Sequence, residues 1–325
     1  MKVFKAALAA SLLVGGSLAL TGQALAEWPE RAVTIIVPWS AGGGTDATAR
    51  AVAQELEERF GQPFNVVNRT GGGGLVGHIT IANSAPDGYT LGVITIETTM
   101  FEAQGLPGAA PENFTLLGRF NADPIGINVR ADAPYATAED LIKAVSANPG
   151  ALKASGANRG GLSHLAWAGL LNTLGVDPEA SPWVASDGSA PAMQQLAANA
   201  ISIVSTSPAE AQSLVDAGEA KTLVVMADER SSLYPDIPTA GEALGVEWSP
   251  LPFRGMAGPA ELPEEVVTKV SEALAEITED EDFITMMESR GFSVAYQDAE
   301  TFTQTVMRSR DALVEAMQAV GLAQQ

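Results

Sequence analysis

The chain has 325 residues, carries 39 acidic against 18 basic side chains for a formal net charge of −21, and contains no cysteine. The absence of cysteine excludes disulfides, thiolate metal sites and a cysteine nucleophile, and the acidic excess argues against nucleic acids and anionic membranes as partners. A chain of this length exceeds the usual size of one domain, so we expect two lobes of about 150 residues each.

The first residues have the pattern of an export signal. Lys2 and Lys5 precede an uncharged apolar stretch at 6–20, and Ala24-Leu25-Ala26 fits a signal-peptidase site. The apolar stretch is shorter than the roughly 20 residues that a membrane span requires. We therefore predict a signal peptide at 1–26, cleavage after Ala26 and a periplasmic protein, with an uncleaved anchor as the alternative. The mature chain keeps 16 basic and 39 acidic residues.

Strand-like and helical patterns alternate in the first third of the chain. In order, we expect a strand at 33–38, a helix at 45–60, a strand at 64–67, a helix at 77–85 and a strand at 89–96. This β-α-β-α-β order favours a parallel sheet with right-handed crossovers.

The same alternation returns further along. We expect strands at 125–129, 151–155, 182–185, 201–205 and 222–227, and helices at 137–148, 163–174, 190–199 and 208–217. After a loop and a short strand near 253–257, three helices follow at 263–278, 280–290 and 299–320. We expect this C-terminal part to return to the first lobe. The predicted lobes are 27–123 together with 245–325, and 124–244.

Two glycine-rich loops stand out, one at 39–46 (WSAGGGTD) and one at 68–74 (NRTGGGG). Each follows a β-branched run and leads into a helical pattern. Backbone N–H groups at the start of a helix have no partner within the helix, and glycine lets a ligand approach them closely. Two such loops in one lobe predict two sets of donors for a small anion.

The sequence gives little support to three classes of enzyme. The segment 42–47 fits the dinucleotide pattern G-x-G-x-x-A, but the second strand ends in Asn68 where an acidic residue would hold a ribose. Only His78 and His164 occur, in no metal-binding array. His164 is expected to have a helix N-terminal or core packing role, and His78 to order the helix behind the second glycine loop. No G-x-S-x-G elbow is present, and Ser163 is expected to cap a helix or to bind a ligand. We expect no catalytic residue, no metal and no cofactor.

Five segments carry a resemblance to a known family. They are 38–50, 68–74 followed by Gly77, 85–91, 154–166 and 234–239. In this order they resemble the substrate-binding proteins of tripartite tricarboxylate transporters, also called Bug receptors or TctC-like proteins, over essentially the whole mature length.

The resemblance implies a two-lobed periplasmic binding protein fold, type II-like, in the α/β class, with a mostly parallel sheet flanked by helices in each lobe. It also implies a non-enzymatic, monomeric receptor whose cleft closes on a small carboxylate-bearing solute and which delivers it to the transporter's membrane subunits. The alternatives are an exported hydrolase or oxidoreductase, and a ligand-sensing subunit for a two-component system.

The resemblance also assigns the residues that hold one ligand carboxylate, largely through backbone amides and ordered water. They are Ser40, Ala41, Gly42, Gly43 and Asp46 in the first loop and Thr70, Gly71, Gly72 and Gly73 in the second. A direct contact of Asp46 with a carboxylate would be repulsive, so Asp46 is expected to fix the loop, to hold a bridging water or to stabilise the first helical turn.

Ligands of open α/β sheets bind at the carboxyl ends of strands. This rule nominates Thr95, Glu97, Thr98, Ser155, Asn158, Ser163, Asp187 and Ser205. Trp39 and Phe101 either wall the cleft or pack between the lobes.

Glu97 leaves the ligand's chemistry open. If buried, it would repel a second ligand carboxylate unless it is protonated, or it would pair with an ammonium or a hydroxyl. The alternative is that it points to solvent or to Arg119. A dicarboxylate, a tricarboxylate, a hydroxy acid, an aromatic acid and an amino acid all remain possible ligands.

Overall fold

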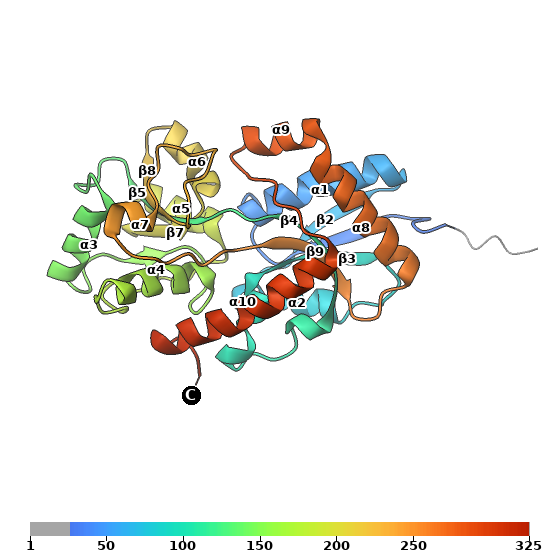
Figure 1. Ribbon diagram of the computed structural model, residues 1–325, viewed down its shortest axis with the longest axis horizontal. Coiled ribbons are helices and arrows are strands. Elements are labelled where there is room, and N and C mark those ends of the chain that lie inside the picture. The colour runs from blue at the N-terminus through green and yellow to red at the C-terminus, as the bar shows by residue number, and fades with distance from the viewer. Residues whose placement is uncertain (1–26, 325) are drawn as a thin grey trace, which may run out of the picture.

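The computed structural model describes residues 27–324 and contains two β-sheets, each flanked by helices (Figure 1). The predicted signal peptide and its cleavage site lie outside the described residues. Among residues 27–324, no helix combines the length and the apolar character needed to cross a membrane.

The first sheet has the strand order β2-β1-β3-β9-β4. Its strands are β1 (Val33–Val37), β2 (Phe64–Asn68), β3 (Thr90–Thr95), β4 (Phe114–Asn121) and β9 (Arg254–Pro259). β1 pairs in parallel with β2 and β3, whereas β9 is antiparallel to both of its neighbours. β1 and β3 are buried along almost their whole length, as expected for strands covered on both faces.

Five α-helices accompany this sheet. They are α1 (Gly44–Phe60), α2 (Leu75–Ala82), α8 (Glu264–Glu279), α9 (Glu281–Ser289) and α10 (Ala299–Ala319). Short 3₁₀ turns complete this part of the chain: η1 (Gly72–Gly74), η2 (Ile96–Thr99), η3 (Glu102–Gln104) and η4 (Pro111–Asn113).

The second sheet has the order β6-β7-β5-β8. Its strands are β5 (Ile125–Arg130), β6 (Ala154–Ser155), β7 (Ile203–Thr206) and β8 (Ala220–Met226), and its helices are α3 (Ala138–Ala147), α4 (Leu162–Thr173), α5 (Ser189–Ala197), α6 (Pro208–Asp216) and α7 (Ala240–Leu244). β5 is antiparallel to both β7 and β8, and β6 is parallel to β7. The strand expected at 182–185 is reduced to a single bridge between Trp183 and Ala154.

The chain crosses between the sheets twice, at 122–124 on the way out and at 245–253 on the way back. Strand β5 follows the first crossing and β9 follows the second, and each runs antiparallel to the other strands of its sheet. Each sheet is otherwise parallel in strand direction, and the predicted two-lobed α/β fold is confirmed. The predicted boundaries at 123/124 and 244/245 fall at these crossings, and we propose them as the limits of the lobes.

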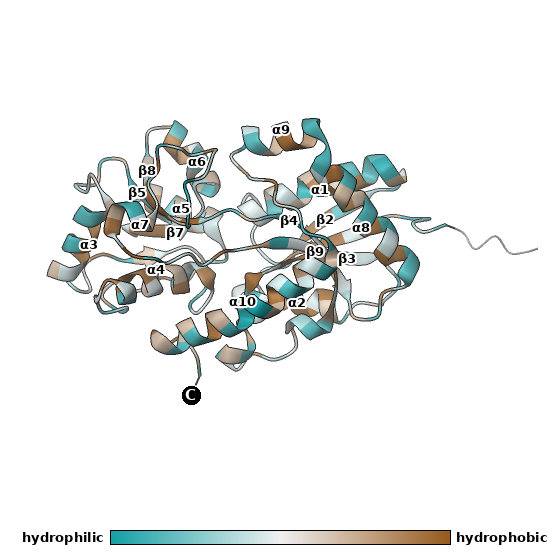
Figure 2. Cartoon of the chain, in the orientation of Figure 1, coloured by the Kyte–Doolittle hydropathy of each residue, from teal (hydrophilic) through white to brown (hydrophobic). Residues whose placement is uncertain are grey.

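Helix α10 joins the cores of both lobes. Phe302, Val306, Leu313 and Met317 lie on one face at helical spacing and are buried, while the opposite face is polar (Figure 2). This apolar face packs on β4 and η2 of the first lobe and touches α4 of the second. One contiguous apolar cluster therefore contains residues of both lobes, such as Ile94 and Leu165.

Candidate ligand-binding cleft

A small cavity of about 70 Å³ lies between the two sheets. The first lobe lines it with Trp39, Ser40, Gly43, Gly44, Thr45, Thr95, Ile96 and Glu97, and the second with Gly156, Ala157, Leu162, Ser163, Gly188, Ser189, Thr206 and Glu210. Residues at and next to the crossings complete the wall: Asn121, Ala122, Asp123, Ile125, Pro252, Phe253 and Arg254. The wall includes the carboxyl ends of β3 and β7, where the rule for open sheets expects a ligand.

Helices α1, α4 and α5 all begin at this cavity. Their N-cap residues are Gly43, Gly161 and Gly188, and none of the three caps its helix with a side chain. The first N–H groups of a helix lack partners within the helix, and the helix dipole adds partial positive charge at this end. Three sets of donors therefore meet at one cavity, which favours an anionic group.

Asp46 fixes the shape of the first glycine loop. Its carboxylate accepts hydrogen bonds from Gly42 N at 3.0 Å, from Asn68 Nδ2 at 2.9 Å and from Arg50 Nη2 at 2.8 Å. Burial alone would raise the pKa of Asp46, but the hydrogen bonds from Arg50, Gly42 and Asn68 outweigh it and lower the pKa below its usual value. Asp46 is not part of the cavity wall, and it lies in the first turn of α1, so the geometry agrees with both the loop-fixing role and the stabilisation of that turn.

The second glycine loop meets the other lobe directly. Gly71, Gly72, Gly73 and Gly74 all have positive φ, which only glycine adopts without strain. A Cβ atom on Gly73 would collide with the side chain of Asn158. This loop therefore packs against the second lobe beside the cavity, and its residues are not part of the wall.

A buried histidine connects the second loop to the cavity wall. His78 Nε2 accepts a hydrogen bond from Thr95 N at 3.2 Å, so Nδ1 carries the proton and donates it to Gly74 O at 2.8 Å. Thr95 Oγ1 accepts from Trp39 Nε1 at 3.3 Å and donates to Glu97 Oε2 at 2.6 Å. The neutral imidazole suits both of its partners, and burial lowers the pKa of His78 to about 4.

This low pKa predicts a pH-dependent stability that His78→Gln removes. The unfolded chain takes up a proton near pH 6.5, whereas folded His78 does so only near pH 4. Between these values the unfolded state binds more protons, so the stability of the wild type falls as the pH falls. From pH 6.5 to pH 5, the free energy of unfolding should drop by about 1.5 kcal/mol more in the wild type than in His78→Gln. Urea unfolding at both pH values measures this difference, and parallel losses in the two proteins would refute it.

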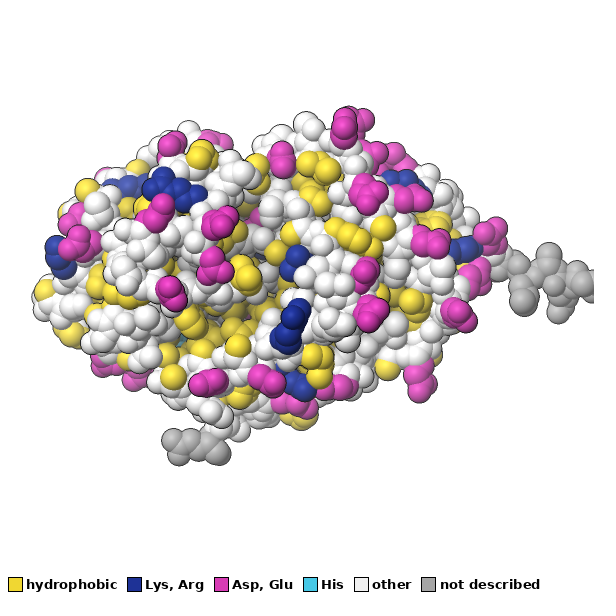
Figure 3. All heavy atoms as spheres, viewed as in Figure 1, with side chains coloured by type: hydrophobic (Ala, Val, Ile, Leu, Met, Phe, Trp, Pro, Cys, Tyr) yellow, Lys and Arg dark blue, Asp and Glu magenta, His cyan; other side chains and the backbone are white. Residues whose placement is uncertain are grey.

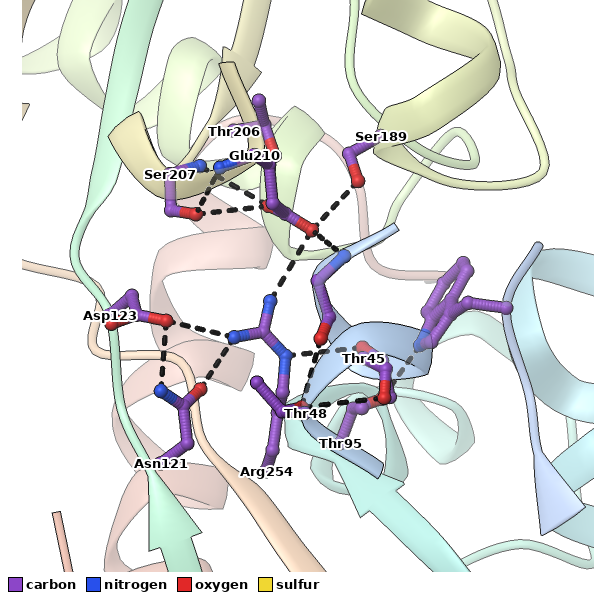
Figure 4. A network of polar contacts seen from close by, with 12 residues as sticks. Thr45, Thr48, Thr95, Asn121, Asp123, Ser189, Thr206, Ser207, Glu210 and Arg254 are labelled. Carbon is purple, nitrogen blue, oxygen red and sulfur yellow. Dashed lines mark hydrogen bonds and ion pairs between the residues drawn. The ribbon is translucent and has the colours of Figure 1, made fainter. Parts of the chain in front are cut away.

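Arg254, in the cavity wall, is the centre of a polar cluster (Figure 4). Its Nη1 donates to Asp123 Oδ2 at 3.0 Å and to Asn121 Oδ1 at 2.5 Å, its Nη2 donates to Glu210 Oε1 at 3.3 Å, and its Nε donates to Thr45 Oγ1 at 3.2 Å. The side chains of Arg254, Asp123 and Glu210 are 11%, 5% and 10% exposed. All three nitrogens of the guanidinium are therefore engaged by the protein.

Two glutamates reach across the cleft to helix starts of the opposite lobe. Glu210, on α6, accepts a hydrogen bond from Gly44 N at the start of α1, at 2.9 Å. Glu97, on η2, accepts one from Leu162 N at the start of α4, at 3.3 Å. Ser40 N also donates across the cleft, to Asp187 O at 3.2 Å. The two lobes touch through these polar contacts around the cavity.

The structure brings together part of the predicted site. Trp39, Ser40, Gly43, Thr95, Glu97 and Ser163 line the cavity. The others lie outside its wall, and their contact with a ligand stays a prediction: Ala41, Gly42, Asp46, Thr70, Gly71, Gly72, Gly73, Thr98, Ser155, Asn158, Asp187 and Ser205.

Several expectations from the sequence need correction. Glu97 is 5% exposed and does not point to solvent, and Arg119 instead donates to Ala295 O. Ser163 does not cap α4, because Gly161 is the N-cap. Phe101 is fully buried beside His78 and is not part of the cavity wall.

The sequence reading missed Asn121, Asp123, Glu210 and Arg254. An arginine at the start of the otherwise uncharged strand β9 is the one local signal for this cluster. His164 has the expected packing role, since it accepts a hydrogen bond from Gly160 N and stacks on Trp183 at 4.5 Å. Within residues 27–324, no group of three acidic or histidine side chains is placed to hold a metal.

The two-lobed fold with a polar cleft between the lobes defines the class: a periplasmic solute-binding protein. The chain belongs to the tripartite tricarboxylate transporter family of receptors, whose TctC family model matches residues 48–322. It is therefore a solute receptor and not an enzyme. The resemblance read from the sequence is confirmed.

Relatives and solved structures agree with this assignment. A UPF0065 protein from the TAR-I ttuE-ttuC' intergenic region of Agrobacterium vitis is 30% identical over 294 residues, which cover 90% of this chain and 84% of the relative. The periplasmic binding protein BugD is similar at a TM-score of 0.84 and 27% identity, covering 92% and 100% of the two chains. MatC from Rhodopseudomonas palustris, solved with bound malate, is similar at a TM-score of 0.81 and 26% identity, covering 89% and 99%.

Proposed function

We propose that this receptor captures a small carboxylate-bearing solute between its lobes and delivers it to the membrane subunits of a tripartite tricarboxylate transporter. The observation that carries the proposal is the meeting of α1, α4 and α5, each with a glycine N-cap, at one cavity. Their N–H groups are pre-aimed donors for a carboxylate, and glycine leaves room for its approach. The bound malate of MatC supports a carboxylate ligand in this family.

A second observation at the same wall supports a ligand. The hydroxyl of Ser40 is shielded from solvent and makes no hydrogen bond to any residue of the described chain. Ser40 lines the cavity next to the start of α1. Because a buried hydroxyl without a partner is costly, a ligand oxygen at this position would remove the penalty.

Hinge closure would couple binding to transport. The lobes are joined by two crossings, and a bound solute that bridges them favours the closed arrangement. We place the mature receptor in the periplasm after cleavage behind Ala26, as a monomer that the membrane subunits recognise in its closed form. Growth of a deletion strain on the ligand separates this uptake role from sensing for a two-component system.

Thermal melting against a panel of acids tests the proposal. The mature protein is first unfolded and refolded to remove carried-over ligand. At a ligand concentration 100 times the dissociation constant, the free energy of unfolding rises by about 2.7 kcal/mol, which corresponds to a shift of several degrees. We expect such a shift with at least one carboxylate, and its loss in Gly43→Val, which places a side chain at the start of α1.

Gly241→Ala is the matched control. Gly241 lies in α7, and a Cβ there meets its nearest atom at an ordinary 3.6 Å. This variant should keep the ligand-induced shift. No shift with any mono-, di- or tricarboxylate, aromatic acid or amino acid would overturn the proposed function.

A further inference from the structure

The cavity wall carries more negative than positive side chains. Glu97, Asp123 and Glu210 line it, and Arg254 is the one basic residue that the described part of the chain contributes. Arg254 is already paired with two of these acids, Asp123 and Glu210. Among the described residues, the cavity therefore holds no uncommitted cation for a second ligand carboxylate, although the face of the molecule in Figure 3 displays both signs of charge.

Two of the three helix starts are already engaged by carboxylates of the protein itself. Glu210 accepts from the first N–H of α1, and Glu97 accepts from the first N–H of α4. A ligand with two or three carboxylates would add its charges to a cavity in which these donors are partly used. Like charges brought together in a buried site are costly, so the wall disfavours a polyanion.

The carboxylate of Glu97 differs from the other two because no basic side chain within residues 27–324 forms an ion pair with it. Its oxygens accept one hydrogen bond each, from the hydroxyl of Thr95 and from the amide of Leu162. Burial raises the pKa of Glu97, and these two hydrogen bonds offset the effect only in part. An ionised Glu97 would gain from a positive partner on the cavity side, since a buried charge without one is unfavourable.

We propose that the ligand carries a protonated amine beside its carboxylate, and that Glu97 receives this ammonium group. The inference rests on the proposed function, because the carboxylate of the same ligand meets the helix N-termini. The cavity then has donor N–H groups at the start of α5, those at the start of α1 that Glu210 does not engage, and an acceptor carboxylate at Glu97. This arrangement matches an amino acid better than a di- or tricarboxylate.

Matched pairs of acids with and without an amino group test this assignment. Isothermal titration of the refolded mature protein compares alanine with propionate, aspartate with succinate, and glutamate with glutarate. In any pair that binds, the amino acid should bind at least about tenfold more tightly than the acid without an amine, because it gains one hydrogen bond to a charged group. In Glu97→Gln this preference should shrink to near onefold, while the acid without an amine keeps its affinity or gains some.

Glu102→Gln is the control, because Glu102 is an exposed acid five positions further along the same lobe. It should leave the preference for the amino acid unchanged.

Carboxylates that bind without a preference for the amine, or a preference that survives in Glu97→Gln, would overturn the ammonium assignment and leave the proposed carboxylate receptor unaffected. A hydroxy acid that binds as tightly as its amino counterpart would also overturn it. If no acid binds at all, the proposed function itself fails. If Glu97→Gln does not fold, the preference of the wild type for the amino acid over the acid without an amine still tests whether the ligand carries an ammonium group.

Discussion

Replacing Arg254 with methionine is expected to lower the free energy of unfolding by about 3–5 kcal/mol, because it leaves two buried carboxylates without their cation. Asp123 and Glu210 are 5% and 10% exposed, and both pair with this guanidinium. Burial alone would raise the pKa of Glu210, but the charge of Arg254 and nearby hydrogen bonds hold it below its usual value. Methionine keeps much of the volume and removes the charge. Urea unfolding of the mature protein at pH 7 measures the loss.

Arg159→Met is the matched control, since it removes the same charge from an exposed pair. Arg159 lies 3.1 Å from Glu179, and the two side chains are 59% and 77% exposed. An exposed pair of this kind contributes roughly 0–1 kcal/mol. Adding Glu210→Gln to Arg254→Met should recover part of the stability, because a neutral amide tolerates the same site better than an unpaired carboxylate. Equal losses in Arg254→Met and Arg159→Met would show that the cluster is not energetically coupled.

Local patterns predicted most of the helices and strands correctly. The helix expected at 137–148 is one of them, and in the structure Thr137 and Asp140 form a capping box at its start. Strand β4 was not predicted, because register shifts between Leu116 and Gly118 and again near Asn121 break its alternation of inward and outward residues. Helix α7 was not predicted either, since five residues are too few to show a helical period.

Some site residues could be predicted from the sequence and others could not. Glu97 could be nominated because it directly follows a predicted strand, and strand ends meet at one edge of a sheet. The partners of Arg254 carry no such signal, since Asp123 is 131 positions away along the chain and Glu210 is 44 positions away. Their meeting depends on how the lobes face each other across two crossings, which periodicity and turn patterns do not encode.

The two glycine loops also differ in what the sequence could predict about them. Both loops have the composition of an anion site, yet only the first contributes to the cavity wall, through Trp39, Ser40, Gly43, Gly44 and Thr45. The positive φ angles of the second loop and its close approach to Asn158 explain its glycines by backbone conformation and packing between the lobes. A glycine-rich loop in a sequence thus indicates a close approach without telling whether a ligand or another part of the chain approaches.

Gly77→Ala is the second substitution with a large expected effect, because it forces α2 away from the start of both glycine loops. A Cβ on Gly77 would lie 2.5 Å from Pro38 Cα and 2.7 Å from Arg69 O, and backbone atoms cannot swing aside as a side-chain end can. Pro38 directly precedes the first loop segment, and Arg69 is the second residue of the second. Overpacking of this kind costs about 1–3 kcal/mol, which exceeds the gain of up to about 1 kcal/mol from placing alanine in a helix.

The displacement should also weaken binding, since His78 follows Gly77 on α2 and connects Gly74 to Thr95 at the cavity wall. Urea unfolding and the ligand-induced melting shift are measured together in Gly77→Ala and in Gly241→Ala, whose new methyl group meets no atom closer than 3.6 Å. We expect the first variant to lose both stability and shift and the second to lose neither. If Gly77→Ala lost stability but kept the full shift, the position of α2 would matter for folding alone, and the binding donors would have to lie on α1, α4 and α5 without support from the second loop.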